Sequence, residues 1–343
     1  MRILVIGGTG FIGRFVTPLL HDSGHTVTVF HRGASVASLP PGVRSLRGDR
    51  HHLLAHQHEL RALAPDVVID MIASSGEQTR TMMDTFRGAA RRVVVLSSMD
   101  VYRACAVLHE LEPGPIEPLP LTEDSPLRTI AKTYPAEEIR TLQQLFGWLD
   151  DAYDKVAVEH TVRSDPDLAA TVLRLPMVYG PGDPLHRCFP VLKRMLDGRL
   201  LIPFEERVAR WRSPRGYVEN VGAAIVLAAT SDRAAGRVYN LGEAEAVSEL
   251  EWAQLIAEAV GWGGRVVALP ADRAPAHLKR PGNLDQDWEA DSPGFARSSA
   301  TQSPCRGQRR FAGRSHWERA HPPAQYSPAG FDYPAEDAAL ATQ

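Results

Sequence analysis

The 343-residue chain lacks the usual marks of a secreted, membrane-bound or nucleic-acid-binding protein. Its three cysteines, Cys105, Cys188 and Cys305, lie far apart and without metal-type spacing, which favours a reduced, cytoplasmic protein. No apolar run approaches the roughly 18–20 residues that cross a membrane as a helix. The net charge of −3 gives no reason to expect nucleic acid or a membrane as a partner. We therefore expect a globular protein with a small-molecule ligand.

The first thirty residues hold the clearest pattern. A short apolar run, Arg2–Ile6, is typical of a strand buried on both faces, and Gly7, Gly10 and Gly13 follow it at three-residue spacing. Apolar positions with helical periodicity come next, and they are Phe11, Phe15, Leu19 and Leu20. A second strand-like run around Val29 completes a βαβ unit.

Glycine at such a turn lets the backbone approach a pyrophosphate, which the N–H groups and the dipole at the helix N-terminus then bind. A glycine triplet placed between a strand and a helix is a strong signal for this use. The sequence therefore predicts a dinucleotide site, and its expected phosphate-binding residues are Gly7, Gly10, Phe11, Ile12 and Gly13.

The kind of dinucleotide depends on the end of the second strand. An acidic residue there would bind the ribose hydroxyls of NAD, but the chain continues with His31, Arg32 and Gly33. Arg32 can pair with a 2′-phosphate, which favours NADP(H) within a general NAD(P) assignment. The alternative is that Arg32 is a solvated turn residue. Asp49 and Arg50, in a later turn, are expected to flank the adenine.

Further strand-like runs alternate with helical patterns along the chain. They are Asp66–Met71, Arg92–Ser97 and Thr171–Leu175. Alternation of this kind predicts an α/β protein with a Rossmann-type, doubly wound parallel sheet. We place the NAD(P)-binding domain at residues 1–180, with a proline-rich loop within 105–150. A smaller C-terminal substrate lobe would then occupy residues 181–343.

Two other segments carry less information. Residues 50–60 hold four histidines, but no catalytic glutamate lies between His52 and His56, so we expect surface histidines and no metal. Residues 291–315 are rich in Ser, Arg, Gly and Gln and lack helical periodicity, so we expect an irregular or disordered segment. A basic RNA contact and a pair of compensating frameshifts are the alternatives for that segment.

Four motifs occur in an order typical of a known family, and a fifth, weaker match follows. They are GGTGFIG (Gly7–Gly13), VVVLSSMDVY (Val93–Tyr102), KVAVE (Lys155–Glu159), LRLPMVYGPGDP (Leu173–Pro184) and YVENVGAAIVLA (Tyr217–Ala228). Over about residues 1–270 the chain resembles the extended short-chain dehydrogenases/reductases of the NAD-dependent epimerase/dehydratase type.

The resemblance implies roles for the matching residues. Ser98, four residues before Tyr102, would hold the substrate oxygen. Lys155 would bind the nicotinamide ribose and lower the pKa of a partner tyrosine. The backbone at Pro176 and Val178 would face the nicotinamide.

The partner tyrosine is out of place. The family has it four residues before the lysine, where this chain has Asp151, and Tyr153 lies only two residues before Lys155. On a regular helix those two residues point about 200° apart. Tyr153 can still serve as acid/base if the helix starts late or is unwound. Otherwise Asp151, Asp100 or Tyr102 takes the role, or hydride chemistry is weakened, as in atypical members with regulatory, structural or RNA-binding roles.

Two further departures bear on the substrate. Met99 and Asp100 stand where sugar-nucleotide dehydratases carry adjacent Asp and Glu, which argues against dehydration. Ser213 stands where sugar-nucleotide enzymes carry an arginine, although Arg212 and Arg215 are close, and Arg215 is our candidate for substrate binding. We expect an NAD(P)-dependent oxidoreductase or epimerase acting on a hydroxyl or carbonyl group. A sugar nucleotide is one option for its substrate, and a homodimer one option for its assembly.

Overall fold

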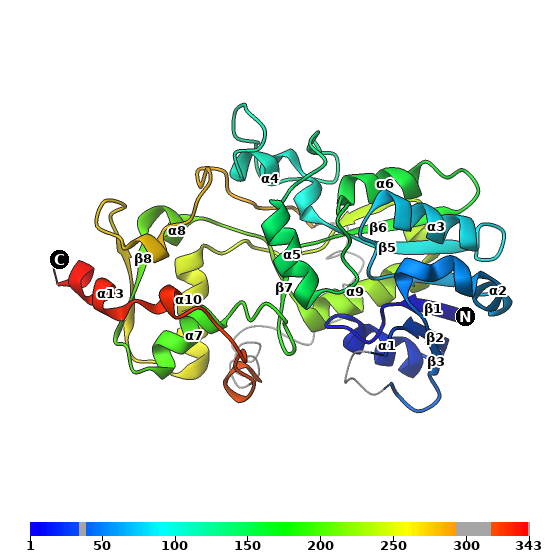
Figure 1. Ribbon diagram of the computed structural model, residues 1–343, viewed down its shortest axis with the longest axis horizontal. Coiled ribbons are helices and arrows are strands. Elements are labelled where there is room, and N and C mark those ends of the chain that lie inside the picture. Colours follow the sequence, from blue (N-terminus) through cyan, green and yellow to red (C-terminus); the bar gives the residue numbers. More distant parts are fainter. Residues whose placement is uncertain (34–38, 293–316, 342–343) are drawn as a thin grey trace.

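Seven parallel strands form the central sheet of the computed structural model, which describes residues 1–33, 39–292 and 317–341 (Figure 1). Their order, β10-β6-β5-β4-β1-β2-β3, shows that the chain starts in the middle, builds one edge and then returns to build the other. The strands are β1 (Arg2–Ile6), β2 (Thr26–His31), β3 (Arg44–Arg47), β4 (Val67–Asp70), β5 (Arg92–Ser98), β6 (Ala169–Leu175) and β10 (Val238–Asn240). The predicted Rossmann-type, doubly wound sheet is confirmed.

A layer of helices covers each face of this sheet (Figure 1). Ile3 and Val5 of β1 pack on the face covered by α1 and α9. Leu4 and Ile6 pack on the opposite face, against α3 and α6. Burial on both faces explains why the strand is an unbroken apolar run. The four helices are α1 (Gly13–Asp22), α9 (Val218–Thr230), α3 (Gly76–Phe86) and α6 (Lys155–Arg163).

A smaller lobe lies at the end of the molecule opposite the N-terminus (Figure 1). Its strands pair in parallel, β8 with β11, and another parallel pair joins β7 to β9. Arg194 and Glu336 tie two of its helices together, with 2.6 Å between Nη2 and Oε1. The elements are β7 (Met177–Tyr179), α7 (Phe189–Leu196), β8 (Leu201–Glu205), α8 (Glu206–Arg210), β9 (Arg215–Tyr217), α10 (Glu249–Val260), β11 (Arg265–Leu269) and α13 (Tyr333–Leu340).

Short elements complete the described chain. They are η1 (Arg50–His56), α2 (Gln57–Ala62), η2 (Met99–Val101), α4 (Arg103–Leu108), α5 (Ala136–Leu145), η3 (Asp232–Ala234), η4 (Ala276–Leu278) and η5 (Pro328–Phe331). In the described ranges no helix is long and apolar enough to cross a membrane. The same ranges contain no group of three or more His, Cys, Asp or Glu able to hold a metal.

Three features differ from the expectations. Helix α1 begins at Gly13 and buries Val16, Thr17 and Leu20, whereas Leu19 is 40% exposed, so the predicted apolar stripe is displaced. The proline-rich segment starts with the buried helix α4, so the open loop begins only after it. Strand β10 and helix α9 pack on the central sheet although both follow residue 180, and the domain division remains a prediction. Most of segment 291–315 lies outside the described residues.

Candidate active site

Three glycines of the turn after β1, namely Gly7, Gly10 and Gly13, meet different structural requirements. Gly7 has a φ of +86°, which L side chains rarely adopt. A Cβ on Gly13 would lie 2.5 Å from the carbonyl carbon of Gly8, so the turn packs too closely for any side chain. A Cβ on Gly10 would meet only the Gly7 oxygen at 3.7 Å and would otherwise project into the neighbouring cavity. The turn is therefore shaped to bring its backbone against a ligand.

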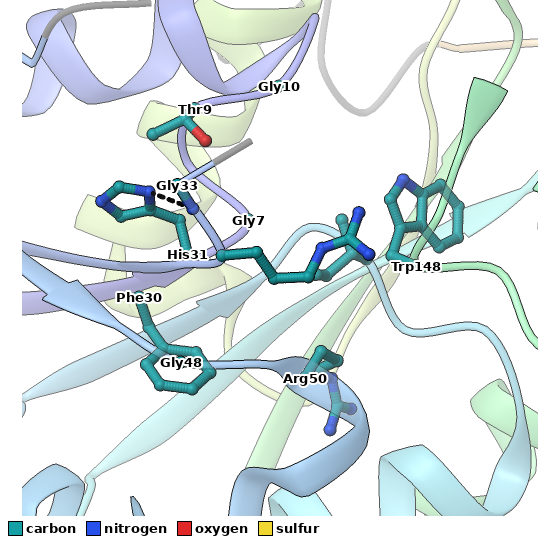
Figure 2. Close-up of a pocket in the computed structure, with 11 residues that line it drawn as sticks. Gly7, Thr9, Gly10, Phe30, His31, Gly33, Gly48, Arg50 and Trp148 are labelled. Atoms are coloured by element: carbon teal, nitrogen blue, oxygen red, sulfur yellow. Dashed lines mark hydrogen bonds between the residues drawn. The ribbon is translucent and has the colours of Figure 1, made fainter. Parts of the chain in front are cut away.

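A cavity of about 750 Å³ lies beside this turn. Helix α1 points its N-terminus at it with no side-chain cap at Ile12, which leaves backbone N–H groups for an anion. Trp148, from the loop after α5, forms part of the far wall, and Figure 2 shows it across the space from Gly7 and Gly10. An uncapped helix end, a glycine cradle and an open cavity are what a dinucleotide pyrophosphate requires, so the residues present fit such a cofactor.

The end of β2 is basic and carries no acid. Arg32 lines the cavity and reaches across it, with its Nη1 donating to the Gly147 carbonyl at 2.9 Å. Asp49 caps η1 by accepting from the His51 backbone N–H at 2.9 Å. Arg50 is buried and paired with Asp70 at 2.8 Å, and Figure 2 shows its side chain directed away from the glycine turn. Arg32 thus faces the cavity and is bonded there to a neutral carbonyl, whereas the Arg50 charge is already balanced by Asp70.

Lys155 is the first residue of α6 and lies at the carboxyl ends of the central strands. Its Nζ donates to the carbonyls of Ala73 at 2.5 Å and Leu96 at 3.0 Å. Burial lowers the pKa of Lys155 to about 8, against the opposing pull of nearby carboxylates such as Asp100. The ammonium lies 5.7 Å from the centre of the Trp148 ring, so it is next to the cofactor-sized cavity.

Ser98 ends β5 on the same edge of the sheet. Its Oγ accepts from the Asp100 backbone N–H at 3.2 Å, and its hydroxyl also interacts with the Asp100 carboxyl. Pro176 and Val178, between β6 and β9, are both buried, and the Val178 carbonyl accepts from Arg187 at 2.8 Å. Ser98 and Lys155 therefore come from neighbouring elements to the edge where ligands of such sheets bind.

Tyr153 lies in this region because α6 starts late. Asp154 has extended backbone angles and caps the helix by accepting from the Val156 N–H, so Tyr153 is outside the helix and the 200° separation does not apply. Its hydroxyl donates to Asp100 Oδ2 at 2.7 Å, and its ring centre lies 5.8 Å from Lys155 Nζ. Tyr153 thus lies beside both Lys155 and Asp100, whose backbone N–H binds Ser98.

Asp100 and Tyr134 complete a cluster that the motifs alone do not define. Asp100 is 1% exposed, and the Tyr134 hydroxyl also contacts its Oδ2, at 3.4 Å. Burial raises the pKa of Asp100, and burial together with the Asp100 charge raises the pKa of Tyr153 well above its ordinary value. Tyr134 has no signal in the sequence, because it stands in a polar loop outside every motif.

A family model now decides what kind of protein this is. The model of the NAD-dependent epimerase/dehydratase family matches residues 3–119 and 151–242, more than half of the chain. The chain belongs to this family. The resemblance inferred from its motifs is confirmed, as is the expectation of an NAD(P)-dependent enzyme at the level of the family.

Curated relatives of this epimerase/dehydratase family member include enzymes and a stem-loop binding protein. The chain is 28% identical to the 2′-dehydrokanamycin reductase of Streptomyces kanamyceticus, over 81% of this chain and 72% of the relative. It is 30% identical to a chloroplast stem-loop binding protein of 41 kDa from Arabidopsis thaliana, over only 34% of each chain. The similarity to this reductase thus extends over most of both chains.

Solved structures share the fold of this family member. The NAD complex of the UDP-glucose 4-epimerase of Thermus thermophilus superimposes with a TM-score of 0.63. It covers 94% of this chain and all of the epimerase at 22% identity. At that identity the likeness shows the fold and leaves the substrate open.

Other candidates in this family member are engaged elsewhere. Asp151 is exposed and accepts from Gln143 Nε2 at 2.8 Å. Tyr102 is fully buried, and its hydroxyl donates to Asn240 at 2.6 Å and so does not face a ligand. Arg215 is paired with the Glu249 carboxylate at 2.6 Å and stacks 4.5 Å over the Trp252 ring. Among the alternatives to Tyr153, only Asp100 lies within the cluster around Lys155.

Proposed function

We propose that this protein is an NADP(H)-dependent reductase that interconverts a ketone and a secondary alcohol on a small polar molecule. The observation that carries the proposal is the convergence of Ser98, Tyr153 and Lys155 at the edge of the sheet. Ser98 and Tyr153 both contact Asp100, and Lys155 lies next to Tyr153 and to Trp148, which lines the cavity at the glycine turn. The similarity to a reductase across most of both chains supports reduction over epimerisation.

Each of the three residues has a distinct part in this scheme. When bound, the nicotinamide cofactor supplies the hydride. Ser98 would turn its hydroxyl proton from Asp100 to the carbonyl oxygen, and Tyr153 gives that oxygen a proton as it becomes an alkoxide. Lys155 holds the ribose and carries the positive charge that favours a tyrosine able to exchange its proton. Gly7, the uncapped N-terminus of α1 and the rest of the glycine turn hold the pyrophosphate.

The preference for NADP(H) rests on the basic end of β2. Arg32 would exchange its bond to the Gly147 carbonyl for a charge-assisted bond to the 2′-phosphate. Arg47 lies against Gly33 on the next strand and adds positive charge. No carboxylate stands in the His31–Gly33 turn to bind a ribose diol instead, although the Thermus thermophilus epimerase was solved with NAD.

The substrate is proposed as a polar ketone that carries no diphosphate. The Arg215 guanidinium already has a carboxylate partner in Glu249, so it offers little net charge to a nucleotide diphosphate. A sugar nucleotide stays the second candidate. Cytoplasmic location and a homodimeric assembly also remain predictions.

The test is a cofactor-linked assay on the purified protein. NADPH and NADH are each offered with a carbonyl panel that includes 2′-dehydrokanamycin, simple cyclic ketones and keto forms of UDP-sugars, and loss of cofactor absorbance is followed. We expect turnover of a ketone with NADPH, and its loss in Lys155→Ala and Tyr153→Phe. Tight NADPH binding without turnover on the whole panel would overturn the proposal. Stem-loop RNA binding by the same preparation would then favour the RNA-binding alternative.

A further inference from the structure

We infer that Asp100 is the proton store of this site, taking the hydroxyl proton of Tyr153 when Tyr153 accepts one from a substrate alcohol and returning it during reduction. The inference rests on the proposed function, because it assumes that Tyr153 faces the substrate. Asp100 itself does not touch the substrate in this scheme. It is a positioning residue that acts through Tyr153.

The geometry places the two groups in direct contact. The Tyr153 hydroxyl donates to Asp100 Oδ2 at 2.7 Å, which is within the range of a good O–H···O bond. A phenolic oxygen that donates one hydrogen bond still has acceptor capacity for a second partner. The tyrosine oxygen can therefore accept a proton on one side while releasing its own on the other.

The family arrangement, in which a lysine stabilises a phenolate, is disfavoured in this chain. A phenolate on Tyr153 would lie against the Asp100 carboxylate in a buried site, and like charges at that distance repel strongly. Asp100 Oδ1 is buried and accepts no hydrogen bond from any described residue, so an ionised Asp100 is also incompletely stabilised. The pair is best satisfied when it shares protons instead of carrying two negative charges.

The proton balance is simple. In oxidation the substrate O–H bond breaks and its proton goes to the Tyr153 oxygen, while the Tyr153 proton moves to Asp100. The carbon that bears this oxygen would give up its hydride to the nicotinamide cofactor, when that is bound, as its C=O bond forms. Reduction runs each step in reverse and starts from protonated Asp100, so one proton and one hydride are transferred and Asp100 ends as the carboxylate. Between turnovers Asp100 regains its proton from solvent after a reduction and releases it to solvent after an oxidation.

Several other groups face Asp100 and influence where the proton sits. Arg128 donates its Nε to the Asp100 carbonyl at 3.0 Å and, with Lys155, favours the ionised carboxylate. Tyr134 donates weakly to Oδ2, and burial, with a further contribution from the nearby Asp100 charge, raises the pKa of the Cys105 thiol. Burial acts against these cations and raises the pKa of Asp100. The balance of these effects leaves the pKa of Asp100 above its ordinary value.

The first test compares pH profiles of alcohol oxidation, using the alcohol made from whichever panel ketone is turned over. In the wild type the rate rises with pH as Asp100 ionises. In Asp100→Asn the base must be Tyr153 itself, so kcat falls about 100-fold and the rise moves to more alkaline pH. Asp151→Asn makes the same chemical change on an exposed neighbour and should leave the profile unaltered. A wild-type profile and near-wild-type kcat in Asp100→Asn would overturn the inference.

The second test needs no substrate, so it separates this inference from the proposed function. Tyrosinate absorbance is followed as the pH rises in the wild type, Asp100→Asn, Tyr153→Phe and the double variant, and thermal melts confirm folding. The ionisation of Tyr153 is taken as the difference between each protein and its Tyr153→Phe counterpart, because Tyr134 also contacts Asp100 and responds to the same change. We expect this difference to appear at lower pH in the Asp100→Asn background than in the wild-type background. Unchanged Tyr153 ionisation in Asp100→Asn would refute the coupling, even if the enzyme reduces a ketone.

Discussion

The buried ion pair between Glu159 of α6 and Arg174 of β6 joins two elements next to the proposed site. Arg174 Nη2 lies 2.7 Å from Glu159 Oε2, its Nε lies 3.0 Å from Oε1, and both side chains are 1% exposed. Ser97 donates to the same Oε1 at 2.6 Å, which ties β5 to the pair. Ser98 follows Ser97 directly, and Lys155 lies one helical turn before Glu159 in α6. We therefore choose Glu159→Gln as the most informative perturbation.

The expected cost follows from the charge that remains. Glutamine keeps one oxygen to accept a hydrogen bond, but Arg174 is left buried without a counter-charge. Breaking such a pair from one side costs about 3–5 kcal/mol of unfolding free energy, and we expect about 3 kcal/mol because part of the bonding survives. Replacing both partners, with Glu159→Leu and Arg174→Met together, should cost less unfolding free energy than Glu159→Gln alone.

Urea unfolding followed by tryptophan fluorescence measures this free energy. The matched control is Asp285→Asn, which breaks the Arg210–Asp285 pair, whose side chains are 60% and 67% exposed. That surface change should cost about 0–1 kcal/mol. If Glu159→Gln destabilises the protein no more than Asp285→Asn, the Glu159 carboxylate does not hold the three elements together and its place in the KVAVE motif needs another explanation.

Three further changes test the proposed cofactor site and the buried Lys155. Gly13→Ala should weaken NADPH binding by about tenfold or more in a fluorescence titration, because its Cβ would lie 2.5 Å from the Gly8 backbone. The control Gly263→Ala, whose Cβ would meet nothing within 4 Å, should bind NADPH as the wild type does. Arg32→Ala should weaken NADPH by about 10–100-fold but NADH little, and equal losses would contradict a 2′-phosphate contact. The folded-state pKa of Lys155, about 8, lies below its unfolded value, so wild-type stability should gain between about pH 8 and about pH 10. Thermal melts should show that gain reduced in Lys155→Met.

The strands and the glycine turn were predictable from the sequence because local chemistry determines them. The apolar runs become strands with nearly the expected extent, and β5 ends at Ser98, one residue beyond the predicted Arg92–Ser97. The backbone angle of Gly7 and the close packing of Gly13 are constraints that only glycine meets, so the spacing alone identified the turn.

Other features depend on contacts between distant segments and left no local pattern. Strand β10 has only three residues, too few to show a period, and it is defined by pairing with β6. A tryptophan such as Trp148 is expected in the core or the lobe interface, yet it lines the cofactor-sized cavity. Its loop is held by Arg32 through Gly147, 115 positions away in the sequence. Tyr134 reaches Asp100 in the same way, from a loop without a motif.

The four-residue spacing of the family tyrosine and lysine presumes that both lie on one helix. In this chain Asp154 accepts from the Val156 N–H and from Arg128 Nη2 at 2.8 Å, so the helix cannot extend past Lys155 without losing both bonds. The residue two positions before Lys155 then follows an extended path that carries its side chain to Asp100, while Asp151 is left at the surface. A tyrosine shifted by two residues is therefore compatible with the site only because the helix cap shifted with it.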